Sequence, residues 1–451
     1  MRRPLVWPPL VETLAAAADH PERLYLVGGV VRDALLGIPS LDLDLAADGS
    51  GLRIARRIAN RIGGAYYPVD AECGTGRIVF DDAHVDIATF RGPTLEADLA
   101  GRDFTINAIA VPLSDPEHII DPLGGEHDLL VERVLRQCSP TSISDDAIRA
   151  LRAVRQAVQF RLRMAPQTTD AVRAAAAALV DESGNLAQPE RVRGDIFKML
   201  KLGRMRQSMR LMHALGLLAV VSPGPIKDEQ IDLLRAVETL LVNISSRRDD
   251  NSAADLLHGT AVMVLDRYRR QLQEHSTIPY PDGRMRAGLL ALATLAAEQF
   301  PAEDWSDQLR LSRDERRVLA GIDRARELAL RDWEPPDVRD IHRYFRATGE
   351  EGIDGILLRL AEILTQGIDP ADWGYLLDKS AGPLLHSFFR AYQQIIAPPP
   401  LLTGTDLMAE LAVEPGPLVG EVLAVLLEEQ AAGTITTREE ALLFVEHYIS
   451  E

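Results

Sequence analysis

The sequence predicts an α+β protein, in which a mixed head over about residues 1 to 140 precedes a mostly helical remainder. Three observations support this class. Short β-prone runs alternate with helical patterns in the first part of the chain. After the Pro-Gly stretch at 222–225, helices rich in Leu, Ala and Val dominate. A length of 451 residues exceeds one ordinary core, so two to four domains are expected.

The composition is that of a globular protein with an acidic balance. Hydrophobic residues make up 46% and charged residues 26%, and the formal net charge is −18. Cys73 and Cys138 stand far apart in no metal-binding spacing, which argues against a disulfide framework or a zinc site and favours the cytoplasm. No apolar run has membrane-spanning length, and prolines interrupt the N-terminus, so neither a membrane partner nor a signal peptide is expected. If the chain binds RNA, its positive charge must be local.

The first predicted strand, 24–27, ends at Gly28-Gly29, and a helix is expected over 30–36. A glycine turn before a helix lets backbone N–H groups approach phosphates. In the next strand Asp42 and Asp44 alternate with leucines, so both carboxylates project from one face. Two such carboxylates can hold a pair of Mg²⁺ ions. Either feature alone is usually an ordinary turn or a solvated edge, but both in this order indicate nucleoside triphosphate chemistry.

The rest of the head continues with a helix over 51–62 and strands over 65–69, 77–80 and 84–90. Asp86 lies in the last of these strands and is a candidate third carboxylate beside Asp42 and Asp44. The alternative is that Asp86 pairs with an arginine at a strand end.

The pattern GG-x-VRD-x-LLG-x-x-x-x-D-x-D over 28–44 resembles class II tRNA nucleotidyltransferases and their bacterial poly(A) polymerase relatives. These belong to the DNA polymerase β-like superfamily, and the resemblance reaches nearly the whole chain. It implies an Mg²⁺-dependent transferase that acts on the 3′ end of tRNA with CTP and ATP as substrates. The resemblance places the metal at Asp42 and Asp44 and the nucleotide at Gly28, Gly29 and Arg32.

The stretch LAGRDFTINAIAV, 99–111, is similar to the RRDFTINA motif of that family, with Gly101 in place of the first arginine. The resemblance implies that Arg102 contacts the phosphates or ribose, with Asp103 beside it. Arginine suits this role because its fixed charge can bind phosphate in a bidentate manner. The alternative is a salt bridge from Arg102 to Asp98 or Asp103.

Arginines recur every three residues along one side of a helix expected within 145–163, and these are Arg149, Arg152 and Arg155. Three like charges in a row suggest neutralisation by a bound anion, whereas solvated arginines with acidic neighbours are the usual alternative. The stretch resembles the EDxxR motif of the family. That resemblance implies that Asp146 and Arg149 select the base, while Arg152 and Arg155 line the path of the triphosphate or primer.

The stretch 189–210 carries seven basic residues against two acidic ones and resembles the neck helix of the family. A basic helix of this length supports binding of an RNA backbone, and a solvated face is the alternative. Stretches 256–265 and 284–298 look like remnants of an HD phosphohydrolase domain. His258 stands at a ligand position, but Ala291 and Leu292 replace the His-Asp pair, so a degenerate, non-hydrolytic domain is expected. The tail over 401–442 resembles the C-terminal module and is expected to form a helix pair.

The motifs and the resemblance together predict four regions: a nucleotidyltransferase head (1–140), a neck (141–222), a helical body (223–397) and a tail (398–451). Full CCA-adding members carry a longer loop where this chain has only residues 91–97, which favours CC addition. A poly(A) polymerase relative is the first alternative. The second is a catalytically silent RNA-binding protein on the same fold.

Overall fold

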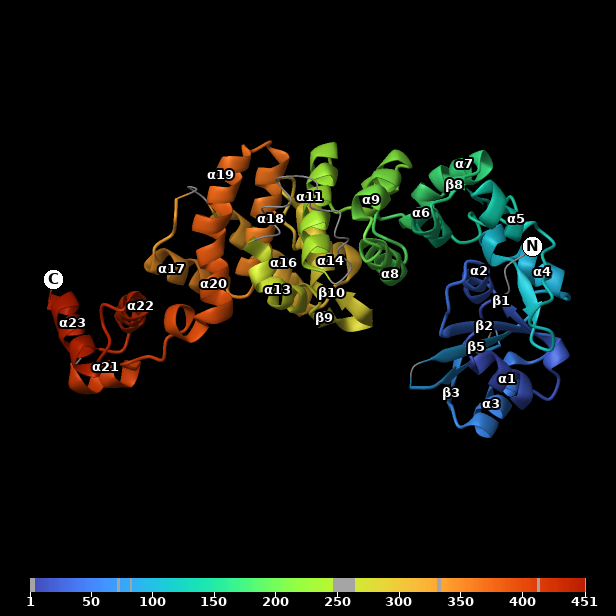
Figure 1. Cartoon of the computed structure of the whole chain (residues 1–451), viewed down its shortest axis with the longest axis horizontal. Coiled ribbons are helices and arrows are strands. Elements are labelled where there is room, and N and C mark those ends of the chain that lie inside the picture. The colour runs from blue at the N-terminus through green and yellow to red at the C-terminus, as the bar shows by residue number, and fades with distance from the viewer. Residues whose placement is uncertain are drawn as a thin grey trace. The chain divides into compact units, whose positions relative to one another are not determined.

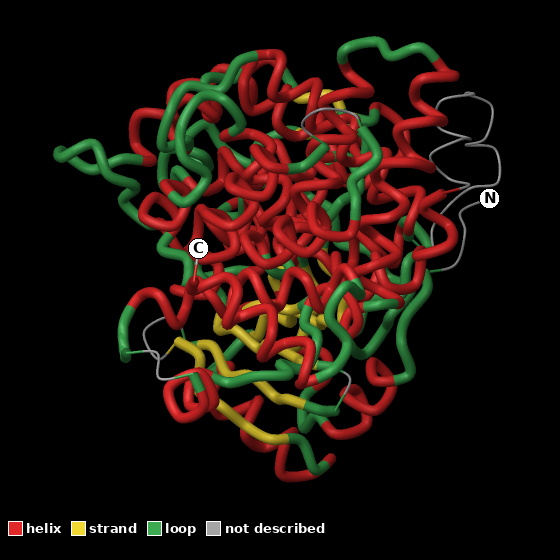
Figure 2. Tube along the Cα trace, turned by 90° about the vertical axis from the view of Figure 1, so that its left-hand side faces the viewer, coloured by secondary structure: helices red, strands yellow, loops and turns green. Residues whose placement is uncertain are grey.

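The computed structural model describes residues 5–70, 74–81, 83–245, 264–330, 334–411 and 414–450. It divides into two compact units, one of Met1–Asp195 with Leu211–Val220 and one of Ile196–Arg210 with Val221–Glu451. The main sheet lies in the first unit, and helices make up most of the second (Figures 1 and 2). The α+β class is therefore confirmed. Within the described ranges, each helix is too short or too polar to span a lipid bilayer.

The head is built on a six-stranded sheet with the order β3-β4-β5-β2-β1-β6. Only β2 and β5 run parallel, and every other neighbouring pair is antiparallel. The strands are β1 (Leu24–Val27), β2 (Asp42–Ala47), β3 (Ala65–Asp70), β4 (Thr75–Val79), β5 (His84–Thr89) and β6 (Ala110–Pro112). The bounds of β1 to β5 agree with the predicted strands to within about two residues, and β6 was not predicted.

The core of the head lies between the sheet and two helices, α1 (Leu10–Ala17) and α3 (Gly51–Ile62), which lie side by side (Figure 1). Leu43 and Leu45 of β2 enter this core. Helix α3 has the predicted bounds because Ser50 caps its N-terminus and Gly63, at φ +82°, ends it. Helix α2 (Gly29–Leu35) follows β1 directly.

The opposite face of the sheet carries a smaller apolar cluster and the polar residues of interest. Val27 and Ala46 pack there against Leu95 and Leu99 of α4 (Leu95–Ala100). Because side chains alternate along a strand, Asp42 and Asp44 lie on the face opposite to Leu43 and Leu45. The predicted projection of both aspartates from one face is therefore confirmed.

Helices α6 (Ile148–Phe160) and α7 (Pro166–Ala175) follow the head. The basic stretch then forms two helices, α8 (Pro189–Leu200) and α9 (Met205–Ala214). The prediction of one long basic helix is therefore wrong. The break falls at Gly203, whose φ of +67° is incompatible with a continuous helix.

The second unit is helical around a buried central helix, α14 (Arg286–Ala296). Ala291 and Leu292 are fully buried in it. His258 lies outside the described residues, so the prediction of a degenerate HD domain stays a prediction. The other long helices are α11 (Asp228–Ile244), α13 (Arg269–Ser276), α16 (Arg313–Leu328), α17 (Val338–Thr348), α18 (Glu351–Thr365) and α20 (Gly382–Arg390).

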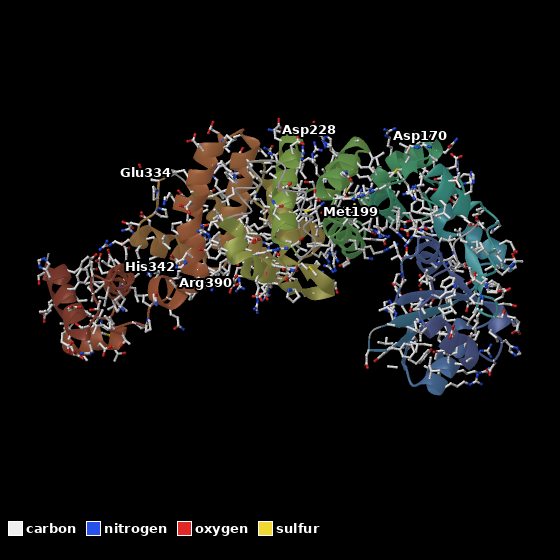
Figure 3. The ribbon with its side chains drawn as sticks, viewed as in Figure 1. Asp170, Met199, Asp228, Glu334, His342 and Arg390 are labelled. Carbon is white, nitrogen blue, oxygen red and sulfur yellow. The ribbon has the colours of Figure 1, made fainter. Side chains whose placement is uncertain are left out.

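The tail contains three helices, α21 (Gly404–Glu410), α22 (Pro417–Ala432) and α23 (Arg438–Ser450), around a core of its own. The predicted helix pair with its Pro-Gly turn corresponds to α21 and α22. A third helix, α23, follows, and at its start the hydroxyl of Thr437 accepts from the backbone N–H of Glu440. Ion pairs join α22 to α17, including Arg339 to Glu429 at 2.8 Å. His342, labelled on α17 in Figure 3, is buried, and its Nδ1 lies 2.7 Å from the carbonyl oxygen of Ile395.

Candidate active site

A row of charged residues crosses three strands on the face of the head sheet opposite to α1 and α3. Asp44 of β2 is the register partner of Asp86 on β5, and Asp86 is the partner of Arg77 on β4. The Nε and Nη2 of Arg77 donate to the two oxygens of Asp86 at 2.7 and 2.6 Å. The arginine pairing that was the alternative for Asp86 is therefore present. Asp86 still lies beside Asp44, and its role as a third carboxylate stays a prediction.

Asp42 stands at the start of the same strand and is largely exposed. Its Oδ1 lies 2.7 Å from Nε2 of His84, which is its register partner on β5. Strands β2 and β5 thus place three aspartates on one face. Asp42 has His84 as a basic partner, and Asp86 has Arg77.

The electrostatics of Asp44 are unfavourable for an ionised carboxylate. Burial, and then the negative charges of Asp42 and Asp86, raise the pKa of Asp44 to about 6, and Arg102 and His84 oppose this. A divalent cation bound here would offset the repulsion between the carboxylates and would be coordinated by their oxygens.

The carboxylates fit a cation held by Asp42 and Asp44. In the described part of the chain, no group of three or more His, Cys, Asp or Glu side chains is arranged to hold a metal ion. Asp86 uses both of its oxygens to bind Arg77.

The glycine turn faces these carboxylates. Gly28 has φ +77°, and a Cβ there would lie 3.1 Å from Nη1 of Arg102 and 3.6 Å from Oδ2 of Asp44. A Cβ on Gly29 would lie 3.3 Å from Nη2 of Arg32. Both positions therefore suit glycine, and the turn, Asp44 and Arg102 come together as the sequence predicted. Arg102 also forms a salt bridge with Asp98 at 3.0 Å, so one of the alternative pairings predicted for Arg102 is present.

A buried hydrogen-bond network connects the glycine-turn helix to α6. Nη1 of Arg32 donates to Asn107 Oδ1 at 2.6 Å. The Nδ2 of Asn107 donates to Asp103 Oδ1 at 2.9 Å and to Gln156 Oε1 at 3.0 Å. Nη2 of Arg152 lies 2.9 Å from Asp103 Oδ2. The network thus connects the helix after the glycine turn, the RDFTINA stretch and α6, which are far apart in the sequence.

Asp103 is only 5% exposed, so it lies within this network. Burial by itself would raise its pKa, but Arg152, Asn107 and the backbone N–H of Phe104 outweigh this effect and lower the pKa. The ionised carboxylate of Asp103 consequently holds Arg152 in place. Arg32 is fixed in a similar way, because its guanidinium lies 4.3 Å from the centre of the Phe160 ring and pairs with Asp33 at 2.8 Å.

The three arginines of α6 have partners inside the chain. Arg149 donates to the carbonyl oxygens of Ser142 at 2.9 Å and of Gly101 at 3.2 Å. Arg152 pairs with Asp103, and Nε of Arg155 lies 2.7 Å from Asp195 Oδ1. Two of the three arginines therefore already have an acidic partner, whereas Arg149 bonds to neutral carbonyls. Binding of an anion by this row stays a prediction.

Asp146 is bound by an arginine from α8. Nη2 of Arg191 donates to its Oδ2 at 2.6 Å, and Nη1 donates to its Oδ1 at 3.2 Å. Asp146 and Arg149 share one turn of the chain, but their side chains have different partners. The roles of Asp146, Arg149, Arg152 and Arg155 toward a nucleotide stay predictions.

Four polar residues of this region were not anticipated from the sequence, namely Arg77, His84, Asn107 and Gln156. Strand alternation offered a signal for the first two, because Arg77 and His84 face the same side as Asp86 in a β4–β5 hairpin. Asn107 lies within the RDFTINA stretch itself. Gln156 is a polar residue that is only 2% exposed on α6, four positions after Arg152.

Comparison with known proteins agrees with this geometry. Residues 24–94 and 92–136 match the family described as the poly A polymerase head domain. Residues 392–445 match tRNA nucleotidyltransferase domain 2.

Relatives extend over the whole chain. The A-adding tRNA nucleotidyltransferase of Deinococcus radiodurans is 32% identical over 96% of this chain and 96% of its own. The CC-adding tRNA nucleotidyltransferase of Geobacter sulfurreducens is also 32% identical, over 96% of this chain and 94% of its own.

Solved structures share the fold. A CCA-adding enzyme in complex with ATP has a TM-score of 0.69 at 22% identity, covering 98% of this chain and 94% of its own. The Thermotoga maritima CCA-adding enzyme complexed with tRNA has a TM-score of 0.64 at 22% identity, with coverage of 98% and 96%. With a head sheet that groups Asp42, Asp44, a glycine turn and Arg102, and with relatives at this identity over its full length, the chain belongs to the tRNA nucleotidyltransferase family.

Proposed function

We propose that this protein adds nucleotides to the 3′ end of tRNA without a nucleic-acid template, with CTP or ATP as substrate. The 3′-hydroxyl attacks the α-phosphate, a new phosphodiester bond forms, and pyrophosphate leaves. The observation that supports this reaction best is the meeting of Asp44, the Gly28 turn and Arg102 on one face of the sheet. Related proteins named for CC and A addition to tRNA support the same reaction.

In this proposal Asp42 and Asp44 hold Mg²⁺, with Asp86 beside them. When bound, the metal activates the attacking hydroxyl and neutralises the charge that develops on the leaving pyrophosphate. The backbone of the Gly28-Gly29 turn and the guanidinium of Arg102 bind the triphosphate.

The first turn of α6 and the residues just before it select the base in this proposal. Asp146 accepts and Arg149 donates hydrogen bonds at the base edge, which suits cytosine or adenine. Arg152 and Arg155 line the path of the triphosphate or primer. Arg32 fixes the helix that follows the glycine turn. We place the reaction in the cytoplasm, as the cysteine usage favours.

Removal of the Asp42 carboxylate tests the assignment of Mg²⁺ to Asp42 and Asp44. Asp42→Ala should abolish Mg²⁺-dependent incorporation of labelled CTP while tRNA binding stays largely intact, because the tRNA-binding surface is unchanged. Asp115→Ala, which removes another exposed acid of the head, is the matched control and should retain activity. Full activity in Asp42→Ala would refute the metal assignment. If the unaltered protein incorporated no CTP in the presence of Mg²⁺, the catalytically silent RNA-binding protein would be the better interpretation.

The number of nucleotides added separates the remaining alternatives. The short segment 91–97, which follows β5 and includes the first residues of α4, favours CC addition, while the A-adding and CC-adding relatives are equally similar. With tRNA that lacks its last three nucleotides, CTP alone should give two additions, and ATP should add nothing further. A third addition with ATP would indicate full CCA synthesis. Long products from ATP and generic RNA would indicate a poly(A) polymerase.

A further inference from the structure

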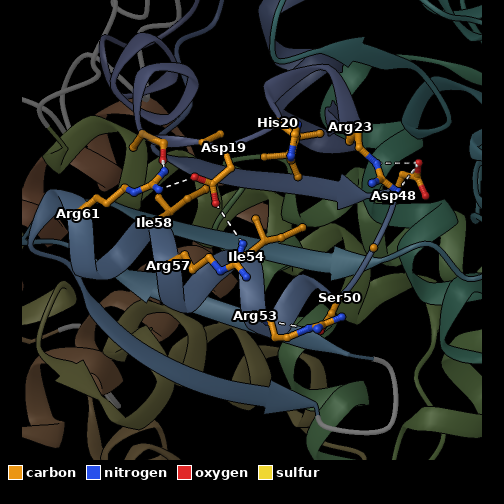
Figure 4. Close-up of a pocket in the computed structure, with 14 residues that line it drawn as sticks. Asp19, His20, Arg23, Asp48, Ser50, Arg53, Ile54, Arg57, Ile58 and Arg61 are labelled. Atoms are coloured by element: carbon orange, nitrogen blue, oxygen red, sulfur yellow. Dashed lines mark hydrogen bonds and ion pairs between the residues drawn. The ribbon is translucent and has the colours of Figure 1, made fainter.

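A pocket lies on the head between the end of α1, the start of β1 and helix α3 (Figure 4). Its volume is about 310 Å³, at the small end of the range for small-molecule sites. The apolar part of the lining includes Leu24 and Ile58, which are buried, together with Ala18 and Ile54, which are partly exposed. Ala18 and Ile54 leave a small apolar surface that a planar ring or a sugar can contact.

Four arginines surround this apolar part, namely Arg23, Arg53, Arg57 and Arg61. Two aspartates, Asp19 and Asp48, and one histidine, His20, also line the pocket, so four positive charges against two negative ones leave a formal surplus of two with the histidine neutral. The chain as a whole has a net charge of −18. Such a local excess of arginine therefore favours an anion at this place.

Asp19 and Asp48 hold three of the arginines at the rim, as the dashed lines of Figure 4 show. Asp19 accepts from Nη1 of Arg57 at 3.1 Å and also from Arg61. Nε of Arg23 donates to Asp48 at 3.0 Å. The guanidinium of Arg53, one turn before Arg57 on α3, has no hydrogen-bond or ion-pair partner among the residues that the structure describes.

The pocket is distinct from the candidate active site. Helix α3 packs on the face of the sheet that receives Leu43 and Leu45, whereas Asp42 and Asp44 lie on the other face. None of the metal or nucleotide residues assigned above lines it.

We infer that this pocket binds a nucleotide, either free or as part of an RNA strand. Arg53 binds the phosphate with a free, planar guanidinium, and Arg57 and Arg61 contribute charge from the same helix face. The hydroxyl of Ser50, which also lines the pocket, is a further polar contact. The base or sugar packs on Ile54, an apolar lining residue that is partly exposed. This inference does not depend on the reaction proposed above.

Isothermal titration of the full-length protein with CMP and with tri-cytidylate tests the inference. Arg53→Glu should weaken binding of at least one of these ligands at a second site by about tenfold or more, the usual effect of losing a charge-assisted hydrogen bond. Arg56→Glu is the matched control, because Arg56 is exposed on the same helix but does not line the pocket. The control should bind as the unaltered protein does.

The ligands distinguish the two sources. Weaker binding of CMP by Arg53→Glu identifies a free nucleotide, and weaker binding of tri-cytidylate alone identifies a nucleotide within RNA. Cytidine, which lacks the phosphate, should bind no more weakly to Arg53→Glu than to the control. Melting temperatures of the two variants show that both are folded. Equal binding of both phosphorylated ligands by Arg53→Glu and Arg56→Glu would overturn the inference.

Discussion

Burial and two neighbouring carboxylates, Asp42 and Asp86, all raise the pKa of Asp44. The position of this residue therefore disfavours its ionised form. Its pKa of about 6, against an ordinary 3.8, means that the folded protein binds this proton more tightly than the unfolded chain. The stability gained from that proton is fully present below about pH 4 and is lost as the pH rises through 6. At neutral pH the ionised group therefore destabilises the fold when no cation is bound.

Asp44→Asn should consequently raise the melting temperature at pH 7 without divalent cations, because the neutral amide avoids a cost of at most about 3 kcal/mol. The same substitution should abolish nucleotide incorporation. At pH 4 the two proteins should melt at similar temperatures, since Asp44 is then protonated. Thermal melting with and without Mg²⁺ measures this, and Mg²⁺ should stabilise the unaltered protein more than the variant. A lower melting temperature for Asp44→Asn at pH 7 would contradict this account.

Elements could be predicted from the sequence where local signals were strong. Helix α3 has the predicted bounds because a serine cap and a left-handed glycine mark its ends. Gly203 also has a left-handed conformation, and it separates the predicted basic helix into two. Partners distant in sequence could not be predicted. Nothing near Asp103 in the chain indicates that it meets Arg152 or that Asn107 joins Gln156.

Gln156 is one of the residues of α6 that link it to the glycine-turn helix, because its side chain accepts from Asn107 at 3.0 Å. Gln156→Leu would deprive the Asn107 amide of one acceptor, at a cost of about 1–3 kcal/mol. Since Asn107 also binds Arg32 and Asp103, we expect incorporation of CTP to fall about tenfold, mainly through a higher KM.

Val154→Ala provides the control for this substitution, because Val154 is fully buried on the same helix but makes no hydrogen bond through its side chain. It should reduce stability by a comparable amount while KM for CTP stays unchanged. Steady-state kinetics and thermal melting of both variants give the two readouts. An equal rise of KM in both would mean that general loosening of α6, rather than the network, affects nucleotide binding.

Across the whole molecule, an acidic chain must bind a polyanion through local positive charge. Much of its basic surface is already neutralised internally, as in the pairing of both Arg206 and Arg210 with Asp232. Lys198 and Lys201 are different, because they are exposed and have no ion-pair partner among the residues that the structure describes. They lie at the C-terminal end of α8 and just after it.

Lys198 and Lys201 should therefore contact the RNA backbone, and their contribution should depend on salt. Each contact with a phosphate releases counterions, so replacing one of these lysines by alanine should reduce the slope of log K against log salt by about 0.7–0.9. Binding of tRNA, measured by fluorescence anisotropy between low and physiological salt, gives this slope. Arg173→Ala, on the exposed face of α7 beside Asp170, is the control and should leave the slope unchanged. If both lysine variants kept the slope of the unaltered protein, the RNA-binding surface would have to lie on other basic residues, because the acidic remainder of the chain repels the phosphates.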